Sequence, residues 1–459
     1  MLRKIFKRIV NLNNIQLRFK SALYVTGDKA GNTYSLLTPH IDFEDRIKDI
    51  NELKFNLKAR KKAIDLDKII KNWSFYRTLI EDLAIMDVTK QALSRDIAQL
   101  LNNKEKESEI NHLKDQARLL KGNYNTLKNY LYPVEETAAL NALSIPNVLD
   151  KRTPIEKETL IHSLHQRPTI KSKSHLNIGE EKKMLRYINP SFFFLENEGA
   201  DFEFALSNYT EEIFTNNNFI PVVSPSFVRS AIVEGCCSDF SDANKIFTIH
   251  EDESKFSVNR LHLTGGASLE AFMAYFTRFS IQTSYLPIKL FTNGKIYEPV
   301  SPDFESKEPG LFHLNQYTTT RFFVATTNNE EAYKNSYDEI VDIIKKFYDP
   351  LGFHYTMTYV PAGKLEDYET LRLSVQMYSA NLERYIEIGF VSLCEEYLSK
   401  RLLVTYKDDN AVKYCRILTG CLVNTQKLFG CILEYNDVEA KDFSVNLTSK
   451  NVQAKKLVK

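Results

Sequence analysis

The feature that most constrains the fold is a pair of apolar stripes between residues 79 and 131. In each stripe the positions follow one another at alternating steps of four and three residues, and a short polar break separates the two stripes. A mean step of about 3.5 residues is typical of a coiled-coil seam. We therefore expect two antiparallel helices that form an arm about 40 Å long. The seam positions are Leu79, Leu83, Met86, Lys90, Leu93, Ile97 and Leu100, then Ile110, Leu113, Ala117, Leu120, Tyr124, Leu127 and Leu131.

The charge on this arm is balanced. Residues 79–131 carry eight basic and eight acidic side chains, so the arm is either simply solvated or contacts phosphates along one face. The candidates for such RNA contacts are Lys90, Arg95, Lys104, Lys106, Lys114, Arg118 and Lys121. The whole chain has a net charge of +1, which excludes a protein that coats nucleic acid through its overall charge.

The first 27 residues are basic and contain no acidic residue. This amphipathic composition predicts a mitochondrial targeting segment over residues 1–27 and a location in the mitochondrial matrix, with a solvated basic arm as the alternative. No stretch of the chain approaches the roughly 18 apolar residues that a membrane helix needs, so we expect no membrane insertion. The basic residues are Arg3, Lys4, Lys7, Arg8, Arg18 and Lys20.

After residue 27, changes in composition and in the spacing of apolar residues divide the chain into four further parts. Residues 42–145 are predicted to be a helical domain whose arm spans about 75–135, and the polar residues 146–190 are predicted to be a linker. Residues 191–440 are rich in β-branched and aromatic runs, and residues 441–459 form a basic tail. The predicted class is α+β, with a mostly antiparallel sheet flanked by helices. Strands are expected at 219–225, 286–297, 311–325, 354–360, 371–377, 385–393 and 402–406, and helices at 269–282, 331–348 and 422–435.

The usual signatures of cofactor and metal binding are missing from the sequence. It contains no P-loop, no G-x-G-x-x-G and no H-E-x-x-H motif. The six cysteines form no C-x-x-C pair, and the pair His162 and His165 lacks a second pair of ligands nearby. We expect neither a cofactor nor a metal site.

Three segments, in their order along the chain, resemble seryl-tRNA synthetases of the bacterial and mitochondrial type. Residues 140–148 (LNALSIPNV) resemble the hinge that follows the family's tRNA-binding arm. Residues 218–227 (NFIPVVSPSF) resemble class II motif 1, and residues 417–434 resemble motif 3. Together with the arm, the resemblance covers roughly residues 42–435. It implies a class II synthetase-like sheet domain and is closest in character to the catalytically degenerate, seryl-tRNA synthetase-like mitochondrial proteins of insects.

The same resemblance implies that several substrate-binding residues have changed. The family's F-R-x-E of motif 2 aligns with residues 291–294. Thr292 then replaces the arginine that binds the α-phosphate, and Gly294 replaces the acidic residue. The family's serine-binding T-x-E aligns with residues 264–266, so Gly266 replaces the glutamate and the carboxylate that would bind serine is absent. The resemblance implies five further replacements: an arginine by His313, a histidine by Asn315, a metal-facing acid by Arg321, an asparagine by Thr419 and the γ-phosphate arginine by Lys427. Three family residues are retained, as Gln316, Gly420 and Glu434.

These changes predict a protein that does not catalyse aminoacylation. One lost donor at a reacting group can cost about 10²–10³ in rate, and threonine cannot replace the bidentate contact of an arginine with phosphate. The alternatives are an active but atypical ATP-dependent aminoacyl ligase, and a homodimeric mitochondrial RNA-binding or assembly factor.

Motif 1 is the dimerisation element of the family, and its apolar residues are present here. The resemblance therefore implies an interface that includes Phe219, Val223, Pro225 and Phe227. Its partner is either a second copy of the chain or mitochondrial seryl-tRNA synthetase, with which this chain would support mitochondrial translation. The RNA partner is expected to be a mitochondrial tRNA or another mitochondrial RNA.

Overall fold

The computed structural model of this chain describes residues 21–24, 37–100, 107–249, 260–300, 309–409 and 411–439. Of the predicted targeting segment, only residues 21–24 lie inside these ranges. Lys104, Lys106 and the basic tail 441–459 lie outside the described residues. Within the described part of the chain, no helix is long and apolar enough to cross a membrane.

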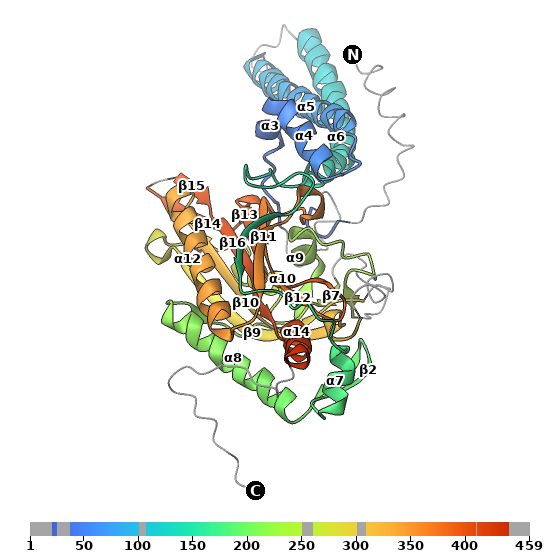
Figure 1. The fold of residues 1–459 in the computed structure, drawn as a ribbon. Coiled ribbons are helices and arrows are strands. Elements are labelled where there is room, and N and C mark those ends of the chain that lie inside the picture. Colours follow the sequence, from blue (N-terminus) through green and yellow to red (C-terminus); the bar gives the residue numbers. More distant parts are fainter. Residues whose placement is uncertain are drawn as a thin grey trace.

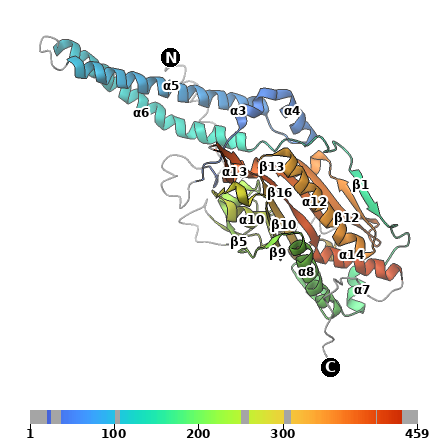
Figure 2. The ribbon, with the colours of Figure 1, turned by 90° about the vertical axis from the view of Figure 1, so that its left-hand side faces the viewer.

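The predicted arm is present. Helices α5 (Leu66–Leu100) and α6 (Glu107–Leu143) pack along each other, and the hairpin they form projects away from the sheet domain (Figure 2). Every seam position is buried or half-buried, whereas most residues between the seam positions are exposed. At the base of the arm, α3 (Phe43–Arg46), η1 (Ile47–Asp49) and α4 (Ile50–Ala59) pack on α5 and α6 around Trp73.

An eight-stranded sheet forms the centre of the second domain (Figure 1). Its neighbouring strands are antiparallel, except that β4 runs parallel to β9. The predicted α+β class with a mostly antiparallel sheet is therefore confirmed. In spatial order the strands are β1 (Thr159–Leu164), β11 (Tyr355–Tyr359), β12 (Leu371–Ser379), β13 (Arg384–Glu395), β16 (Arg416–Asn424), β10 (Gln316–Thr326), β9 (Ile288–Tyr297) and β4 (Ile220–Pro221).

Successive residues of a strand point to opposite faces of a sheet, and each face of this sheet buries its own cluster. On β10, Phe322 belongs to one cluster and Phe323 to the other. The first face is covered by α7 (His175–Glu181), α8 (Glu198–Asn216), α12 (Glu330–Tyr348) and α14 (Thr425–Val438), and the second by α9 (Ser230–Gly235), α10 (Leu269–Phe276) and α13 (Tyr397–Leu402).

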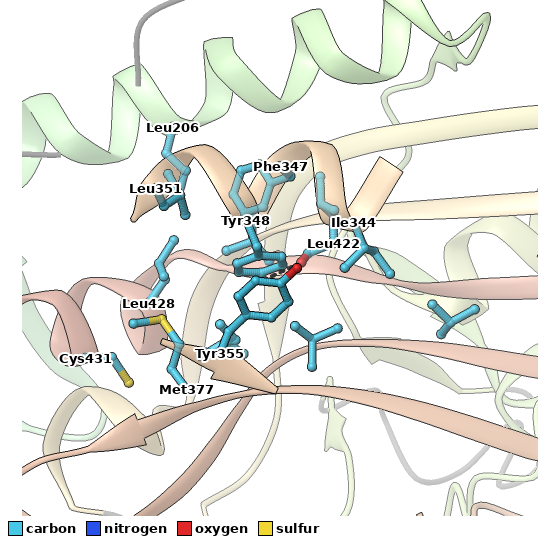
Figure 3. Close-up of a cluster of buried hydrophobic side chains, with 14 of the residues drawn as sticks. Leu206, Ile344, Phe347, Tyr348, Leu351, Tyr355, Met377, Leu422, Leu428 and Cys431 are labelled. Carbon is cyan, nitrogen blue, oxygen red and sulfur yellow. Dashed lines mark hydrogen bonds between the residues drawn. The ribbon is translucent and has the colours of Figure 1, made fainter. Parts of the chain in front are cut away.

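Figure 3 shows part of the larger cluster, where aromatic rings pack among aliphatic side chains. The ring of Tyr348 on α12 lies 5.2 Å from the ring of Tyr355 on β11. The hydroxyl of Tyr348 donates a hydrogen bond of 2.7 Å to the carbonyl oxygen of Leu422. This bond satisfies the polar end of a fully buried tyrosine, which would otherwise oppose its burial.

The interpretation of residues 146–190 as a linker is wrong. This stretch contributes strand β1, which pairs with β11 at the edge of the main sheet, and it also contains α7 and β2 (Leu185–Asn189). An edge strand has a partner on one side only, and most of β1 is exposed. Its six residues alternate little between apolar and polar, so the sequence alone does not mark it as a strand.

Several predicted element boundaries also differ from the structure. The strand predicted over 219–225 shortens to Ile220–Pro221, and residues 422–424 end strand β16 before α14 begins. The remaining strands form small sheets outside the main one: β2 with β3 (Phe192–Leu195), β5 (Phe227–Arg229) and β6 (Phe247–Thr248) on either side of β7 (Leu261–Leu263), and β8 (Ser280–Ile281) with β14 (Thr405–Asp408) and β15 (Ala411–Tyr414). Short 3₁₀ turns are η3 (Thr283–Tyr285), η4 (Gly310–Phe312), η5 (Asp349–Leu351) and η6 (Ala362–Lys364).

The hinge residue Asn147 fastens the arm to the sheet domain. Its side-chain amide donates to the carbonyl oxygens of Tyr368 at 2.9 Å and Cys394 at 2.8 Å. Its own carbonyl oxygen accepts hydrogen bonds from Asn56 at 2.8 Å and Arg60 at 3.1 Å, both on or next to α4. Asn147, which is buried, thus links α4 at the base of the arm to the loop at Tyr368 and to strand β13 at Cys394.

Candidate functional site

A cavity of about 600 Å³ lies against the face of the main sheet that α9 and α10 cover. Side chains from β9, β10, β12, β13 and β16 form its floor, and the start of α10 forms part of its wall. The lining residues are Cys237, Ser238, Lys245, Ile246, Thr264, Ser268, Leu269, Glu270, Ile296, Tyr297, Glu298, Pro299, Tyr317, Arg321, Glu366, Tyr368, Arg372, Glu387, Ile388, Gly389, Phe390, Cys421, Asn424 and Lys427.

Positive and negative side chains balance in this cavity. Four basic residues of the described lining face four carboxylates, so the site has no excess of positive charge that would attract an anion. The basic residues are Lys245, Arg321, Arg372 and Lys427, and the acidic residues are Glu270, Glu298, Glu366 and Glu387.

Two carboxylates of the protein itself bind the guanidinium group of Arg372. Its NH1 donates to Glu369 at 3.0 Å and its Nε donates to Glu387 at 3.2 Å, while the ring of Phe390 lies 3.7 Å below the guanidinium. Burial raises the pKa of Glu387, but Arg372 and the hydroxyl of Ser374 lower that pKa more, so the net shift is downward. This arginine is an internal ion-pair partner with no hydrogen-bonding fork left for a ligand.

Arg321 has a different environment. Its Nε has no hydrogen-bond partner among the described residues, and its guanidinium lies 5.0 Å from the ring of Phe390. Burial disfavours the charged form of Arg321, but Tyr317, Cys421 and Glu298 raise its pKa. Burial and then the negative charge of Glu298 raise the pKa of Tyr317. The cavity therefore has a cation, a neutral phenol and a carboxylate side by side.

The structure brings together only some of the site residues predicted from the sequence. Thr264, Arg321 and Lys427 line the main cavity, and His313 borders a small adjoining cavity of about 50 Å³. Gln316 and Thr419 line neither cavity: Gln316 is half-buried at the start of β10, and Thr419 is buried in β16 with its hydroxyl donating to Phe322.

Thr292 and Gly294, the residues laid on motif 2, are not among the described residues that line the cavity. Both residues face the cavity side of β9 but lie beneath it, where Thr292 pairs with Arg321 in the sheet register. A Cβ atom on Gly294 would lie 3.3 Å from the Cβ atom of Ala267. Strand β9 reaches the cavity at its other end, through Tyr297 and Glu298. Glu298, which the sequence interpretation did not single out, is therefore one of the residues that line the cavity.

Gly266 is enclosed by backbone. A Cβ atom at this position would lie 2.6 Å from the carbonyl oxygen of Ser224, a distance that forces the backbone to move. The preceding Gly265 has a φ of +96°, which side chains other than glycine rarely adopt. A glutamate at position 266 therefore does not fit this backbone.

The retained Glu434 is a structural residue. It is fully buried and accepts hydrogen bonds from His175 Nδ1 at 2.9 Å and from the Ser379 hydroxyl at 2.6 Å. The other ring nitrogen of His175 accepts the backbone N–H of Leu311 at 3.1 Å. Gly310, with a φ of +69°, gives the histidine room, because a Cβ atom there would lie 2.6 Å from His175 Nε2. This network joins α7, α14 and the segment that leads into β10.

The predicted RNA-binding residues of the arm differ in how accessible they are. Arg95, Lys114, Arg118 and Lys121 are exposed. Lys90 is half-buried, with its ammonium 3.4 Å from the Asp87 carboxylate and 5.3 Å from the centre of the Tyr124 ring.

The predicted interface residues are exposed with one exception. Val223 is 95% exposed and Phe227 is 51% exposed, and Pro225 is also exposed. Phe219 is wrong as an interface residue, because it is only 3% exposed and packs against the rings of Phe214 and its neighbours in the core. Its neighbour Ile220, 60% exposed, lies at the surface instead.

Metal-binding and disulfide chemistry find no support in the described residues. They contain no group of three or more His, Cys, Asp or Glu side chains that could hold a metal ion. All six cysteines carry free thiols, and five of them are buried.

Comparison with known proteins assigns the class of this fold. Residues 259–436 match the tRNA synthetase class II core domain (G, H, P, S and T). The fold is similar to the cytoplasmic serine-tRNA ligase of Naegleria fowleri, solved with AMP, with a TM-score of 0.73 at 17% identity over 86% of this chain and 93% of that chain. It is also similar to the seryl-tRNA synthetase of Pyrococcus horikoshii, solved with ATP, with a TM-score of 0.74 at 16% identity over the same shares.

The sequence relatives narrow this class to the seryl type. The chain is 24% identical over 435 residues to the serine–tRNA synthetase-like protein Slimp of Drosophila melanogaster, covering 95% of this chain and 93% of that protein. It is 24% identical over 450 residues to the mitochondrial serine–tRNA ligase of Mus musculus, covering 93% and 84%. The chain thus has a class II tRNA synthetase core domain and is related to seryl-tRNA synthetases over nearly its whole length.

Proposed function

We propose that this chain is a non-catalytic, seryl-tRNA synthetase-like protein of the mitochondrial matrix. It pairs with the active mitochondrial seryl-tRNA synthetase or binds mitochondrial RNA, and in this way supports mitochondrial translation. The relationship to Slimp and to mitochondrial serine–tRNA ligases supports the mitochondrial assignment.

The balanced charge of the cavity is the observation that carries this proposal. An ATP-binding site needs positive charge that is free to meet phosphate oxygens. Here Arg372 is held by Glu369 and Glu387, and the cavity wall also contains Glu298. Adding a triphosphate would place its negative charge beside Glu298, which costs free energy.

The serine subsite supports the same conclusion. The ammonium group of an amino acid needs a carboxylate close by, and the family supplies it from the position of Gly266. That glycine is enclosed by the backbone of Ser224. Of the carboxylates in the cavity wall, Glu270 has its pKa raised by burial, which weakens it as a partner for a cation.

The decisive experiment is ATP–pyrophosphate exchange with the purified full chain. We expect no exchange above background with serine or with any of the other standard amino acids, while active mitochondrial seryl-tRNA synthetase prepared in parallel gives robust exchange with serine. Calorimetry with ATP should show no binding at concentrations that saturate the active enzyme. Exchange with any amino acid would instead support an atypical ATP-dependent aminoacyl ligase.

A further inference from the structure

Residues 366–370 belong to two parts of the molecule at once. They lie in the loop between η6 and strand β12. The side chains of Glu366 and Tyr368 line the main cavity, as does that of Arg372 near the start of β12. The main-chain carbonyl oxygens of the same loop, by contrast, bind the hinge segment and the base of the arm. We name residues 366–370 the cavity loop.

All five carbonyl oxygens of the cavity loop accept hydrogen bonds from the hinge segment or from the base of the arm. The backbone N–H of Asn147 donates to Asp367 at 2.7 Å, and its side-chain amide donates to Tyr368 at 2.9 Å. The backbone N–H of Asp150 donates to Thr370 at 3.0 Å. Because the loop would lose these bonds if it shifted alone, its position is tied to that of the arm.

Arg60, which directly follows α4, binds the other two carbonyl oxygens. Its Nη1 donates to Glu366 at 3.0 Å, and its Nη2 donates both to Glu369 and, at 3.1 Å, to the carbonyl oxygen of Asn147. Its Nε donates to the side chain of Asn56 on α4 at 2.9 Å. The side chain is only 3% exposed. Because a guanidinium is planar and its N–H groups diverge at fixed angles, Arg60 fixes three carbonyl groups relative to α4.

The side chain of Glu369 continues this connection into the cavity. It is fully buried. Its Oε2 accepts the backbone N–H of Glu366 at 2.9 Å, and its Oε1 accepts a hydrogen bond from Nη1 of Arg372 at 3.0 Å. A continuous series of hydrogen bonds therefore leads from Arg60, at the base of the arm, to a side chain in the cavity floor. Breaking any of these bonds leaves a polar group without its partner, which makes the connection stiff.

We propose that Arg60 is a positioning residue that couples the arm to the cavity, so that a structured RNA bound to the arm stiffens the cavity wall. Binding that restricts the motion of the arm also restricts the loop that the arm holds, and coupling of this kind needs no change in the mean structure. The RNA part rests on the proposed function, whereas the link through Arg60 rests on the hydrogen bonds of the cavity loop.

Hydrogen–deuterium exchange of the purified full chain, without RNA, tests the link. In Arg60→Gln we expect the amides of residues 366–372 to exchange about tenfold faster, because two carbonyl groups lose their donor. Arg60→Lys keeps a buried cation and should show a smaller rise, which covers the case that Arg60→Gln does not fold. The control Arg77→Gln removes an arginine of α5 that binds Glu44 at 3.0 Å, and should leave this exchange unchanged.

The thiol of Cys237 provides a second readout inside the cavity. Cys237 is half-buried and lines the cavity. Burial raises the pKa of its thiol, and the nearby carboxylates of Asp367 and Glu366 raise that pKa further. The rate at which a maleimide labels Cys237, measured by mass spectrometry of its peptide, therefore reports how often the cavity loop opens. We expect faster labelling in Arg60→Gln than in the wild type.

Adding a transcript of mitochondrial serine tRNA then tests the coupling. In the wild type and in Arg77→Gln the bound transcript should slow the labelling of Cys237 about fivefold, at the low end of ordinary coupling between sites. In Arg60→Gln the transcript should bind equally well but leave the labelling rate unchanged.

The outcomes separate this proposal from the proposed function. Unchanged exchange of residues 366–372 in both Arg60 variants, or a rise that is equally large in the core strand β16, would overturn the link. Equal slowing of the labelling in Arg60→Gln and in the wild type would overturn the coupling. A transcript that binds none of the proteins would defeat RNA binding and with it the stiffening by RNA, whereas faster exchange in Arg60→Gln alone would still establish the link.

Discussion

At the scale of single residues, the retained Glu434 explains why some family positions persist in a changed site. It binds two side chains and the backbone N–H of Asn381 at 3.1 Å, and none of these contacts faces the cavity. Its position in the fold accounts for its retention without any catalytic role. By contrast, Thr264, Arg321 and Lys427 do face the cavity.

The first residue-scale prediction follows from this network. Glu434→Ala should lower the free energy of unfolding by about 3 kcal/mol, because it leaves His175 and Ser379 without their buried acceptor. Ser379→Ala removes one donor to Glu434 and the acceptor of the Leu382 backbone N–H, and should cost about 1–2 kcal/mol. Thermal and urea unfolding of both variants measures the difference. Equal losses in the two variants would contradict the role of Glu434 as the centre of the network.

The ion pair of Arg372 and Glu387 predicts a dependence on pH. Because the folded-state pKa of Glu387 lies below its ordinary value, the stabilisation is complete above that ordinary value of about 4.3 and is lost as the pH falls through the folded-state pKa. The Tm difference between wild type and Glu387→Gln should therefore be constant from pH 8 to 5 and shrink below about pH 4. Glu211→Gln, at an exposed position on α8, is the control and should show no such trend.

At the scale of elements, a helix or strand could be predicted from the sequence where the residues that stabilise it lie close together in the chain. The arm could be predicted because its seam is written into consecutive turns of each helix. Strand β1 could not, because its partner β11 lies about 190 residues away in the sequence. Nor could the sequence show that Tyr297 and Glu298 line the cavity, because that depends on how the strands of the sheet pair across long distances in the sequence.

The exposed charges of α6 predict how the arm would bind RNA. Lys114, Arg118 and Lys121 are spaced by four and three residues, so they share one helix face. Neutralising all three should weaken RNA binding and reduce the slope of log K against log salt by about 2, since each lost phosphate contact removes about 0.7–0.9. The matched control neutralises Lys334 and Lys346 on α12 and should leave the slope unchanged. Equal slopes for both variants would mean that the arm is a spacer.

At the scale of the whole molecule, the sheet domain presents exposed apolar side chains beside a polar, charge-balanced cavity. Ile220, Val223 and Phe227 lie on or between short strands at the edge of the domain, and α10, which contacts β5, adds the exposed Tyr275. Exposed apolar groups gathered in this way are typical of an interaction surface. Such a surface is consistent with the proposed pairing of the chain with a partner subunit.

The last prediction concerns the partner. Because the interface of this fold family is isologous, the same surface suits a second copy or the homologous surface of mitochondrial seryl-tRNA synthetase. We expect co-expression to give a heterodimer by size-exclusion chromatography with mass determination. Val223→Asp should release free subunits, because it buries a charge at the interface without a counter-ion. The control Ile170→Asp changes an equally apolar side chain, 65% exposed, outside this surface and should leave the heterodimer intact. Separate homodimers with no mixed species would show instead that the chain pairs with itself.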